Sequence, residues 1–306
     1  MATEESERAL IERVLARPVA DATRAVWGFQ NRTDIVTLGS GDRVVVQRYR
    51  RRDDAAYRLR VMRALWRPAA EAGIAIPRVR EADLDADPAW VIFDALPGVP
   101  VPESGDAGLE SPRFPAIARS MGELLLSFRR LPTAGLQLDD RWADPGRLAA
   151  HAARWVRQIT GLAATERTAL AELLGRVPAL FAERPVVLAH GDFAPVNVLT
   201  DGTSLTGLLD FESVRLADPL FDVAWWAWAV SFASPAVLES AWPPFLQGAG
   251  IDATDPELPV RVRSLQVLRM LELLAGETSL APDVQRIVAD RLRSMFRYAD
   301  GRTTCR

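Results

Sequence analysis

The sequence predicts an α+β fold of two lobes, a small β-rich lobe followed by a larger helical lobe. Short β-like segments separated by turn residues occupy the region from about residue 24 to 93, whereas helical periodicity of apolar residues prevails after about residue 113. A proline-dense segment, LPGVPVP at 96–102, lies between the two regions. With 306 residues, of which 49% are hydrophobic, the chain can bury a substantial core.

The first region begins with a helix, expected over 4–16 from the spacing of its apolar residues. A meander of three strands follows, because the turn sequence GSGD at 39–42 separates two apolar runs. Asp53 is expected to cap a helix that runs to about residue 72 and is ended by Gly73. The strands expected in this region are 25–27, 35–38, 44–46, 77–79 and 90–93.

The segment 96–102 cannot continue a sheet or a helix, because proline lacks an amide hydrogen and has a fixed φ. We therefore place the lobe boundary near residue 96, which gives an N-terminal lobe of residues 1–96 and a C-terminal lobe of residues 97–306. The second lobe is mostly helical, with three short strands between its third and fourth helices. The expected helices are 113–130, 145–160, 164–182, 217–232, 234–247, 258–275 and 283–298, and the expected strands are 186–188, 198–199 and 205–209.

The composition excludes several classes of protein. The formal charge is −3, so no basic excess favours nucleic acid, and all 37 basic residues are arginine, which excludes chemistry that needs a lysine ammonium. One cysteine, Cys305, and two histidines cannot form a disulfide framework or a standard zinc site. No stretch is long enough to span a bilayer and the N-terminal residues are acidic, so we expect a cytoplasmic protein without membrane or nucleic-acid partners.

The segment HGDFAPVNVLTDGTSLTGLLDFE, residues 190–212, carries the residues best suited to chemistry. It places Asp192, Asn197 and Asp210 beside strands within twenty residues. An amide and a carboxylate that share a metal with phosphate oxygens suit Mg²⁺, and the remaining carboxylate can orient a hydroxyl. Taken singly, Asp192 or Asn197 is more readily explained as a turn residue than as a site residue. Their combination with two flanking strands favours a metal and phosphate site.

The same segment, followed by DPLFDVAWW, resembles the aminoglycoside phosphotransferase family and related small-molecule kinases. The likeness is dense over 188–226, and lobe order and size agree over most of the chain. It implies a protein-kinase-like fold, ATP or GTP as co-substrate with Mg²⁺, and a small-molecule hydroxyl as acceptor. By this resemblance Asp192 is the catalytic base, and Asn197 and Asp210 hold the metal. His190 is expected to brace the loop through hydrogen bonds.

The resemblance also indicates nucleotide contacts in the first lobe. Gly28 and Asn31 lie in the loop 28–33, where the family has a loop that covers the phosphates, although a plain hairpin explains a single glycine equally well. The segment VIFDALPG, 91–98, resembles the hinge. There the backbone of Asp94 and Leu96 would contact the adenine edge, and Phe93 would occupy the gate position.

The chain departs from the family on its third strand. The family has a lysine or arginine there, paired with a glutamate on the next helix, whereas this chain has Gln47 and Arg58 at the two positions. Strand alternation turns Arg48 away from Gln47, so Arg48 cannot replace the missing cation. Either Arg58 reaches the phosphates from the helix with Gln47 bonded beside it, or Arg58 is a solvated helix residue.

Three functions are compatible with these residues. A phosphotransferase is favoured. A nucleotide-binding pseudokinase with a regulatory role would explain the lost strand cation but not the retained base and metal ligands, and a metal-dependent hydrolase would not explain the hinge. The acceptor is open between an aminoglycoside and an apolar compound such as a macrolide. The first would use acidic side chains, and the second would use aromatic ones. The acidic candidates are Asp139, Asp140, Asp144, Glu272 and Glu277, and the aromatic ones are Trp225, Trp226 and Trp228.

Overall fold

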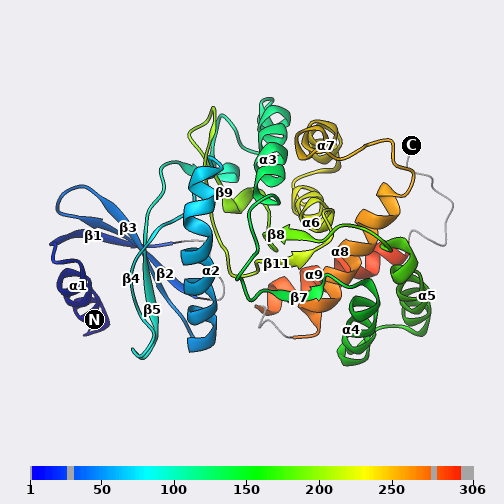
Figure 1. Cartoon of the computed structure of the whole chain (residues 1–306), viewed down its shortest axis with the longest axis horizontal. Helices are drawn as coiled ribbons and strands as arrows, with labels where there is room; N and C mark the ends of the chain where they lie inside the picture. The colour runs from blue at the N-terminus through cyan, green and yellow to red at the C-terminus, as the bar shows by residue number, and fades with distance from the viewer. Residues whose placement is uncertain (1, 26–30, 277–280, 298–306) are drawn as a thin grey trace.

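The structure, a computed structural model, describes residues 2–25, 31–276 and 281–297. The N-terminal part is an antiparallel five-stranded sheet of order β1-β2-β3-β5-β4, which lies between two helices (Figure 1). Its elements are α1 (Ala2–Leu15), β1 (Val19–Arg24), β2 (Arg32–Leu38), β3 (Arg43–Arg48), α2 (Arg52–Glu71), β4 (Val79–Asp83) and β5 (Trp90–Asp94).

Alternation along the strands divides this sheet into two apolar faces. Val44 and Val46 of β3 join a small core beneath α1, which also includes Ile11. Val91 and Phe93 of β5 point to the other face and belong to the main core of the protein. Because successive strand residues point to opposite faces, one short sheet carries both cores.

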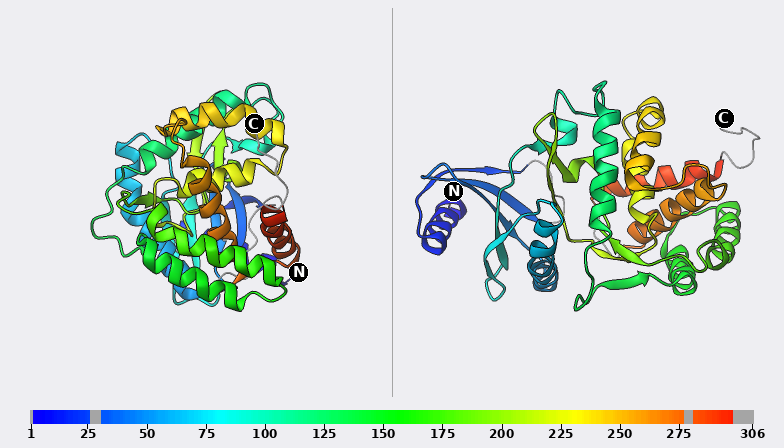
Figure 2. Two further views of the ribbon diagram at one scale, coloured as in Figure 1. Left: turned by 90° about the vertical axis from the view of Figure 1, so that its right-hand side faces the viewer. Right: turned by 45° about the horizontal axis from the view of Figure 1, so that its top comes forward.

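The remainder is helical with two small sheets set among the helices (Figure 2). One sheet has the order β10-β9-β6 and the other has the order β7-β11-β8. The elements are β6 (Val99–Pro100), η1 (Val101–Glu103), α3 (Phe114–Phe128), β7 (Asp139–Trp142), α4 (Pro145–Gln158), α5 (Ala164–Leu180), β8 (Val187–Ala189), η2 (Pro195–Asn197), β9 (Val198–Thr200), β10 (Leu205–Leu208), β11 (Arg215–Ala217), α6 (Phe221–Val230), α7 (Pro235–Ala249), α8 (Leu258–Leu274) and α9 (Pro282–Arg297). Within the described ranges, no helix is both long and apolar enough to cross a membrane.

Two glycines allow α3 and α7 to pack with their backbones in contact. A Cβ at Gly122 would lie 2.3 Å from the carbonyl oxygen of Phe245, and one at Gly248 would lie 2.1 Å from that of Arg119. Such distances leave no room for a side chain. The α3/α7 pair therefore forms a close-packed layer behind α6, the helix that borders the candidate site.

The structure corrects several expected elements. The first strand is Val19–Arg24 instead of 25–27, of which only Ala25 is described. The fourth strand, Val79–Asp83, begins where 77–79 was expected to end. Asp53 lies in the first turn of α2, whose N-cap is Arg51. Its negative charge therefore interacts favourably with the helix dipole, but Asp53 does not cap the helix. The sequence analysis missed β7 and β11 altogether.

The connector expected at 96–102 also has more structure than predicted. Val99–Pro100 pairs with β9 as an edge strand, and Val101–Glu103 forms a 3₁₀ turn. Proline is tolerated at both places, because an edge strand and the first turn of a helix each contain amides that need no partner within the element. The lobe boundary itself remains a prediction.

Candidate active site

The loop that carries Asp192 is fixed by Asp222 at the start of α6. The two carboxylate oxygens of Asp222 accept the backbone N–H groups of His190 at 2.7 Å and Gly191 at 2.9 Å. Burial raises the pKa of this carboxyl, although His190 and the two amides favour its charged form. Gly191 has φ +86°, and a Cβ there would lie 1.9 Å from the carbonyl oxygen of Ser213. Only glycine fits this position.

Both carboxylate oxygens of Asp192 accept a hydrogen bond. The indole Nε1–H of Trp225 donates to Oδ1 at 2.6 Å, and the amide Nδ2 of Asn197 donates to Oδ2 at 3.0 Å. The same amide donates to the backbone oxygen of Asp192 at 2.8 Å. The carboxylate is therefore held in one plane, and each of its oxygens keeps a lone pair for a further donor.

His190 joins this loop to the one that carries Asp210. Its ring Nε2 lies 2.8 Å from the carbonyl oxygen of Leu209, and its Nδ1 accepts the N–H of Asp192 at 3.4 Å. The N–H of Leu209 donates to the carbonyl oxygen of Asn197 at 2.8 Å. His190 is fully buried, as expected of a residue that braces the loop. Asp192, Asn197 and Asp210 therefore lie on adjoining, hydrogen-bonded segments.

Helix α2 of the N-terminal sheet contributes a buried cation. The Nη1 of Arg58 lies 2.9 Å from Oδ1 of Asp210 and 3.2 Å from Oε1 of Glu212, and its guanidinium lies 5.3 Å from the ring centroid of Phe93. Burial alone would lower the pKa of Arg58, but Tyr49, Glu212 and Asp210 outweigh it and raise that pKa. With 5% of its surface exposed, Arg58 is not a solvated helix residue.

Two more residues of the first lobe lie beside this ion pair. The Nδ2 of Asn31 donates to Oε1 of Glu212 at 2.8 Å. The Oε1 of Gln47 accepts a hydrogen bond from the hydroxyl of Tyr49 at 2.7 Å, and burial raises the pKa of that hydroxyl. The structure therefore bonds Gln47 to Tyr49, a neighbour that the sequence analysis did not consider.

The remaining predicted nucleotide residues are only partly described. Gly28 lies outside the described residues. Phe93 is buried beneath Arg58, and the N–H of Asp94 donates to the carbonyl oxygen of Arg78 at 2.8 Å. The backbone N–H of Asp94, a group expected at the adenine edge, is therefore already paired within the fold. The side chain of Leu96 packs against Gly207, where a Cβ would lie 2.5 Å from its Cδ1.

The donor atoms fit a metal that is shared with phosphate. With Nδ2 of Asn197 bonded to Asp192, its Oδ1 is the amide atom available as a ligand. The side chain of Asp210 is 41% exposed and is bonded to Arg58 through Oδ1, and the residue has φ +63°. The described part of the chain contains no group of three or more His, Cys, Asp or Glu side chains that could hold a metal ion by itself. Two hard oxygen ligands suit Mg²⁺ that takes its other ligands from phosphates and water.

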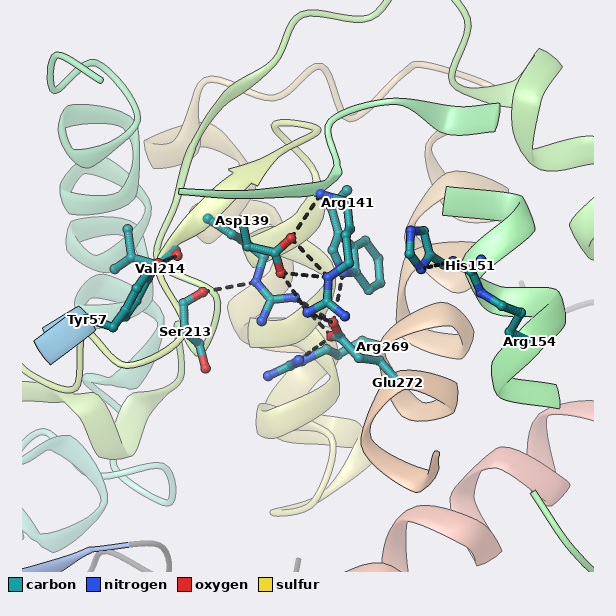
Figure 3. A network of polar contacts seen from close by, with 11 residues as sticks. Tyr57, Asp139, Arg141, His151, Arg154, Ser213, Val214, Arg269 and Glu272 are labelled. Carbon is teal, nitrogen blue, oxygen red and sulfur yellow. Dashed lines mark hydrogen bonds and ion pairs between the residues drawn. The ribbon is translucent and has the colours of Figure 1, made fainter. Parts of the chain in front are cut away.

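Four of the five acidic side chains proposed for a cationic acceptor have other partners, and Figure 3 shows two of them, Asp139 and Glu272. Glu272 is 3% exposed and is paired with Arg215 at 2.9 Å and with Arg269. Asp139 is paired with Arg141 at 2.8 Å. Asp140 pairs with Arg147, and Asp144 caps α4 by accepting the N–H of that same residue at 2.6 Å. Glu277 lies outside the described residues.

The three tryptophans of α6 differ in surroundings. Trp226 is fully buried and stacks on Phe245 at 3.7 Å between ring centroids. Trp225 stacks on Trp228 at 4.2 Å, on the side of the helix that meets Asp192. Trp226 and the largely buried Trp225 thus pack in the core, as expected, and Trp228 is partly buried.

A sequence model of the phosphotransferase enzyme family, APH, matches residues 21–257 of this chain. The chain belongs to this family. The resemblance to aminoglycoside phosphotransferases that the motifs indicated is therefore confirmed.

Two curated relatives are aminoglycoside 3'-phosphotransferases. The one from Streptomyces fradiae is 33% identical over 160 residues, which are 50% of this chain and 57% of the relative. The one from Streptomyces ribosidificus is 32% identical over 174 residues, 51% of this chain and 59% of the relative. The chain thus matches a little over half the length of these relatives.

Solved structures confirm the two-lobed, protein-kinase-like α+β fold. The GDP and kanamycin complex of APH(2")-IIia superposes with a TM-score of 0.76 at 15% identity, covering 97% of this chain and 99% of that one. Macrolide 2'-phosphotransferase MphH from Brachybacterium faecium gives 0.67 at 18% identity, covering 99% and 100%. A choline/ethanolamine kinase family protein from Mesorhizobium loti gives 0.67 at 19% identity, covering 97% and 94%.

Sequence analysis missed three residues that shape the site. Glu212 was noted only as part of a motif, although it binds both Arg58 and Asn31. Tyr49 lies two residues after Gln47, on the same face of the sheet. Trp225 follows Asp222 by three residues, a spacing that places both on one side of α6 and was the available signal.

Proposed function

We propose that the protein transfers the γ-phosphate of ATP or GTP to a hydroxyl group of a small molecule, with Mg²⁺ as cofactor. The observation that carries the proposal is the hydrogen-bonded grouping of Asp192, Asn197 and the segment leading to Asp210. A base with both oxygens oriented lies beside two hard oxygen ligands, which is the arrangement that phosphoryl transfer requires.

Each residue has a distinct part in the reaction. The Asp192 carboxylate orients the acceptor hydroxyl and takes its proton as the oxygen bonds to the γ-phosphorus. The bond between that phosphorus and the bridging oxygen breaks, and the nucleoside diphosphate leaves. Oδ1 of Asn197 and the free oxygen of Asp210 would hold Mg²⁺, which when bound neutralises phosphate charge.

Arg58 supports the proposal because it supplies the cation that the third strand lacks. Its guanidinium lies against the proposed metal ligand Asp210, within the same group of side chains that would face the phosphates. We propose that Arg58 contacts the nucleotide phosphates from α2, while Gln47 and Tyr49 occupy the space of the usual strand cation. An arginine fork suits phosphate oxygens.

We propose that the acceptor is a molecule with few positive charges. The described carboxylates that could attract a polycation are paired with arginines or bonded to backbone. The Asp192 carboxylate is bonded to the indole of Trp225, whose ring stacks on Trp228 and is contacted by the buried guanidinium of Arg269. A largely apolar acceptor such as a macrolide fits these surroundings better than an aminoglycoside does.

A phosphate-transfer assay tests the proposal. The protein is incubated with MgATP or MgGTP and either a macrolide or kanamycin, and phosphorylated product is detected by mass spectrometry. We expect transfer to the macrolide. In Asp192→Asn, transfer should fall by about 10²- to 10⁴-fold, because the base is lost, whereas nucleotide affinity should change only a few fold.

The outcomes separate the alternatives. Undiminished transfer by Asp192→Asn would refute the mechanism. Transfer to kanamycin alone would overturn the proposed acceptor and leave the chemistry intact. Tight nucleotide binding without transfer to any acceptor would favour the pseudokinase, for which the changed strand cation is the supporting observation.

A further inference from the structure

A tryptophan on α6 contacts the proposed catalytic carboxylate directly. The indole Nε1–H of Trp225 donates to Oδ1 of Asp192 at 2.6 Å, opposite the bond from Asn197 to Oδ2 at 3.0 Å. Trp225 lies one turn after Asp222, which holds the backbone at His190 and Gly191. Helix α6 therefore binds the loop of Asp192 at two points. Asp222 accepts hydrogen bonds from the backbone of the loop, and Trp225 donates to the carboxylate of Asp192.

The ring of Trp225 is itself contacted by two other side chains. It stacks on Trp228 with 4.2 Å between centroids and 13° between planes, and the guanidinium of Arg269 lies 5.5 Å from its centroid. Trp225 is largely buried, with 7% of its surface exposed. A tryptophan has few rotatable bonds, and these contacts restrain the ring with its N–H directed at Oδ1 of Asp192.

Arg269 is in turn anchored by a buried ionic group. It donates to Glu272, which also accepts both bonds from Nη1 of Arg215, at 3.0 and 2.9 Å, and one from the indole of Trp142 at 3.2 Å. Glu272 is paired with Arg215, Arg269 and, at 3.6 Å, Arg141, and Arg269 is the guanidinium of this group that lies over the Trp225 ring. A cation over the ring polarises the indole and strengthens its N–H as a donor.

We propose that Trp225 is a positioning residue for Asp192, with Arg269 as the side chain that keeps its ring in place. A carboxylate bonded on one oxygen only could rotate about its Cβ–Cγ bond, whereas donors on both oxygens fix the lone pairs that meet the acceptor hydroxyl. Misplacement of a catalytic group by about 1 Å can cost about 10²-fold in rate. The proposal rests on the phosphotransferase function given above.

The test compares two tryptophans of the same helix. Trp225→Phe keeps an aromatic ring for Trp228 and Arg269 but loses the N–H. Trp226→Phe makes the same change at a ring that stacks on Phe245 and whose Nε1 has no hydrogen-bond partner among the described residues. We expect Trp225→Phe to lower kcat for macrolide transfer by about ten- to a hundredfold with KM for MgATP or MgGTP within about threefold. Trp226→Phe should keep kcat within about threefold of the parent value, even if its melting temperature falls by as much as that of Trp225→Phe.

A second measurement does not depend on turnover. The nine tryptophans of the chain each give an indole N–H resonance in a ¹⁵N-correlated spectrum of the full-length protein. The resonance that disappears in Trp225→Phe should lie downfield, because its hydrogen is bonded to a carboxylate, and should move upfield in Asp192→Asn. An indole resonance unaffected by Asp192→Asn would overturn the proposal. Equal losses of kcat in the Trp225 and Trp226 variants would also overturn it.

These two measurements distinguish the inference from the function on which it rests. A parent protein that transfers phosphate to no acceptor would refute the proposed function, and the resonance shift would still show whether Trp225 orients the Asp192 carboxylate. A resonance shift with unchanged kcat would refute the positioning role while leaving the phosphotransferase function standing.

Discussion

Arg58 carries a buried positive charge from α2 to two carboxylates of the site, Asp210 and Glu212. If it also contacts phosphate, Arg58→Ala removes a charge-assisted hydrogen bond of about 1.5 to 3 kcal/mol, which is about one to two decades in nucleotide affinity. Gln47→Ala should lower nucleotide affinity by less, about 1 kcal/mol at most, because Gln47 is bonded to Tyr49 and offers no charge to the phosphates. Calorimetric titration of each folded variant with MgATP and MgGTP measures both effects.

A charge reversal provides the control for that experiment. Gln47→Arg combined with Arg58→Glu rebuilds the ion pair of the family across the same two elements, and it should bind nucleotide better than Arg58→Glu alone. Arg58→Ala also leaves Asp210 and Glu212 beside each other without a cation, so loss of stability is expected and is measured separately by denaturation. Unchanged affinity in folded Arg58→Ala would show that Arg58 has no phosphate contact.

At the residue scale, sequence reasoning succeeds where the residues are close along the chain. Asp192 and Asn197 are five apart, and their bond follows from one short loop. The bond of Trp225 to Asp192 spans 33 positions, and that of Glu212 to Asn31 spans 181, so both depend on packing that no local pattern specifies. The pairing of Glu272 with Arg215 also depends on such packing. It explains why the expected role of Glu272 as a contact for a cationic acceptor could not be judged from the sequence.

Among elements, the β8–β9 loop and the segment after β10 carry the two proposed metal ligands. Since they offer two side chains, Asn197 and Asp210, the rest of an octahedral shell must come from phosphates and water. We therefore expect Mg²⁺ to bind weakly alone and tightly with ATP or GTP. Calorimetric titration with MgCl₂, with and without a non-hydrolysable nucleotide, tests this. Tight binding in the absence of nucleotide would instead indicate a hydrolase-like metal site.

Helix α8 is joined to β11 by the buried pairing of Glu272 with Arg215. Burial would raise the pKa of Glu272, but Arg215 and Arg269 outweigh it and lower that pKa from 4.5 to about 2. A carboxylate with a lowered folded pKa stabilises the fold above its unfolded pKa and loses that contribution as pH falls. A shift of this size corresponds to about 3 kcal/mol, lost between about pH 4.5 and 2.

The matched variant for this pH dependence is Glu272→Gln. It leaves two buried guanidinium groups without their carboxylate and should be less stable than the parent by about 3 kcal/mol or more at pH 7. That difference should shrink as pH falls from 5 toward 2, because the parent then loses the same charge. Urea denaturation across this range measures it, and a difference independent of pH would contradict the role assigned to Glu272.

The long helices could be predicted from sequence within a few residues, because each shows several turns of apolar periodicity. α8 was expected at 258–275 and is Leu258–Leu274. Strands β7 and β11 were missed because they have four and three residues and are charged, DDRW and RLA. What makes them strands is that β11 pairs with β7, more than seventy positions before it, and on its other side with β8.

At the scale of the whole molecule, the two parts share one core. Val91 and Phe93 of the N-terminal sheet belong to the same buried cluster as Leu208 and Leu271 of the helical part. Polar contacts cross at the same place, including the bond from Tyr57 of α2 to the carbonyl oxygen of Val214. Among the residues that the structure describes, the smaller core beneath α1 forms a second, separate cluster. This continuity explains how Arg58 of α2 is held against Asp210, a proposed metal ligand.

A shared core predicts that both parts unfold together. Val91→Ala removes two methyl groups from a fully buried position in β5 and should cost about 2 kcal/mol. If the core is continuous, amide hydrogens of β3 and of α8 should lose protection by the same free energy in this variant, as hydrogen exchange measured by mass spectrometry would show. Lobes that unfold independently would lose protection in β3 while α8 kept that of the parent. Arg58 would then approach Asp210 from a part of the molecule that opens on its own, and nucleotide affinity would follow the stability of the sheet.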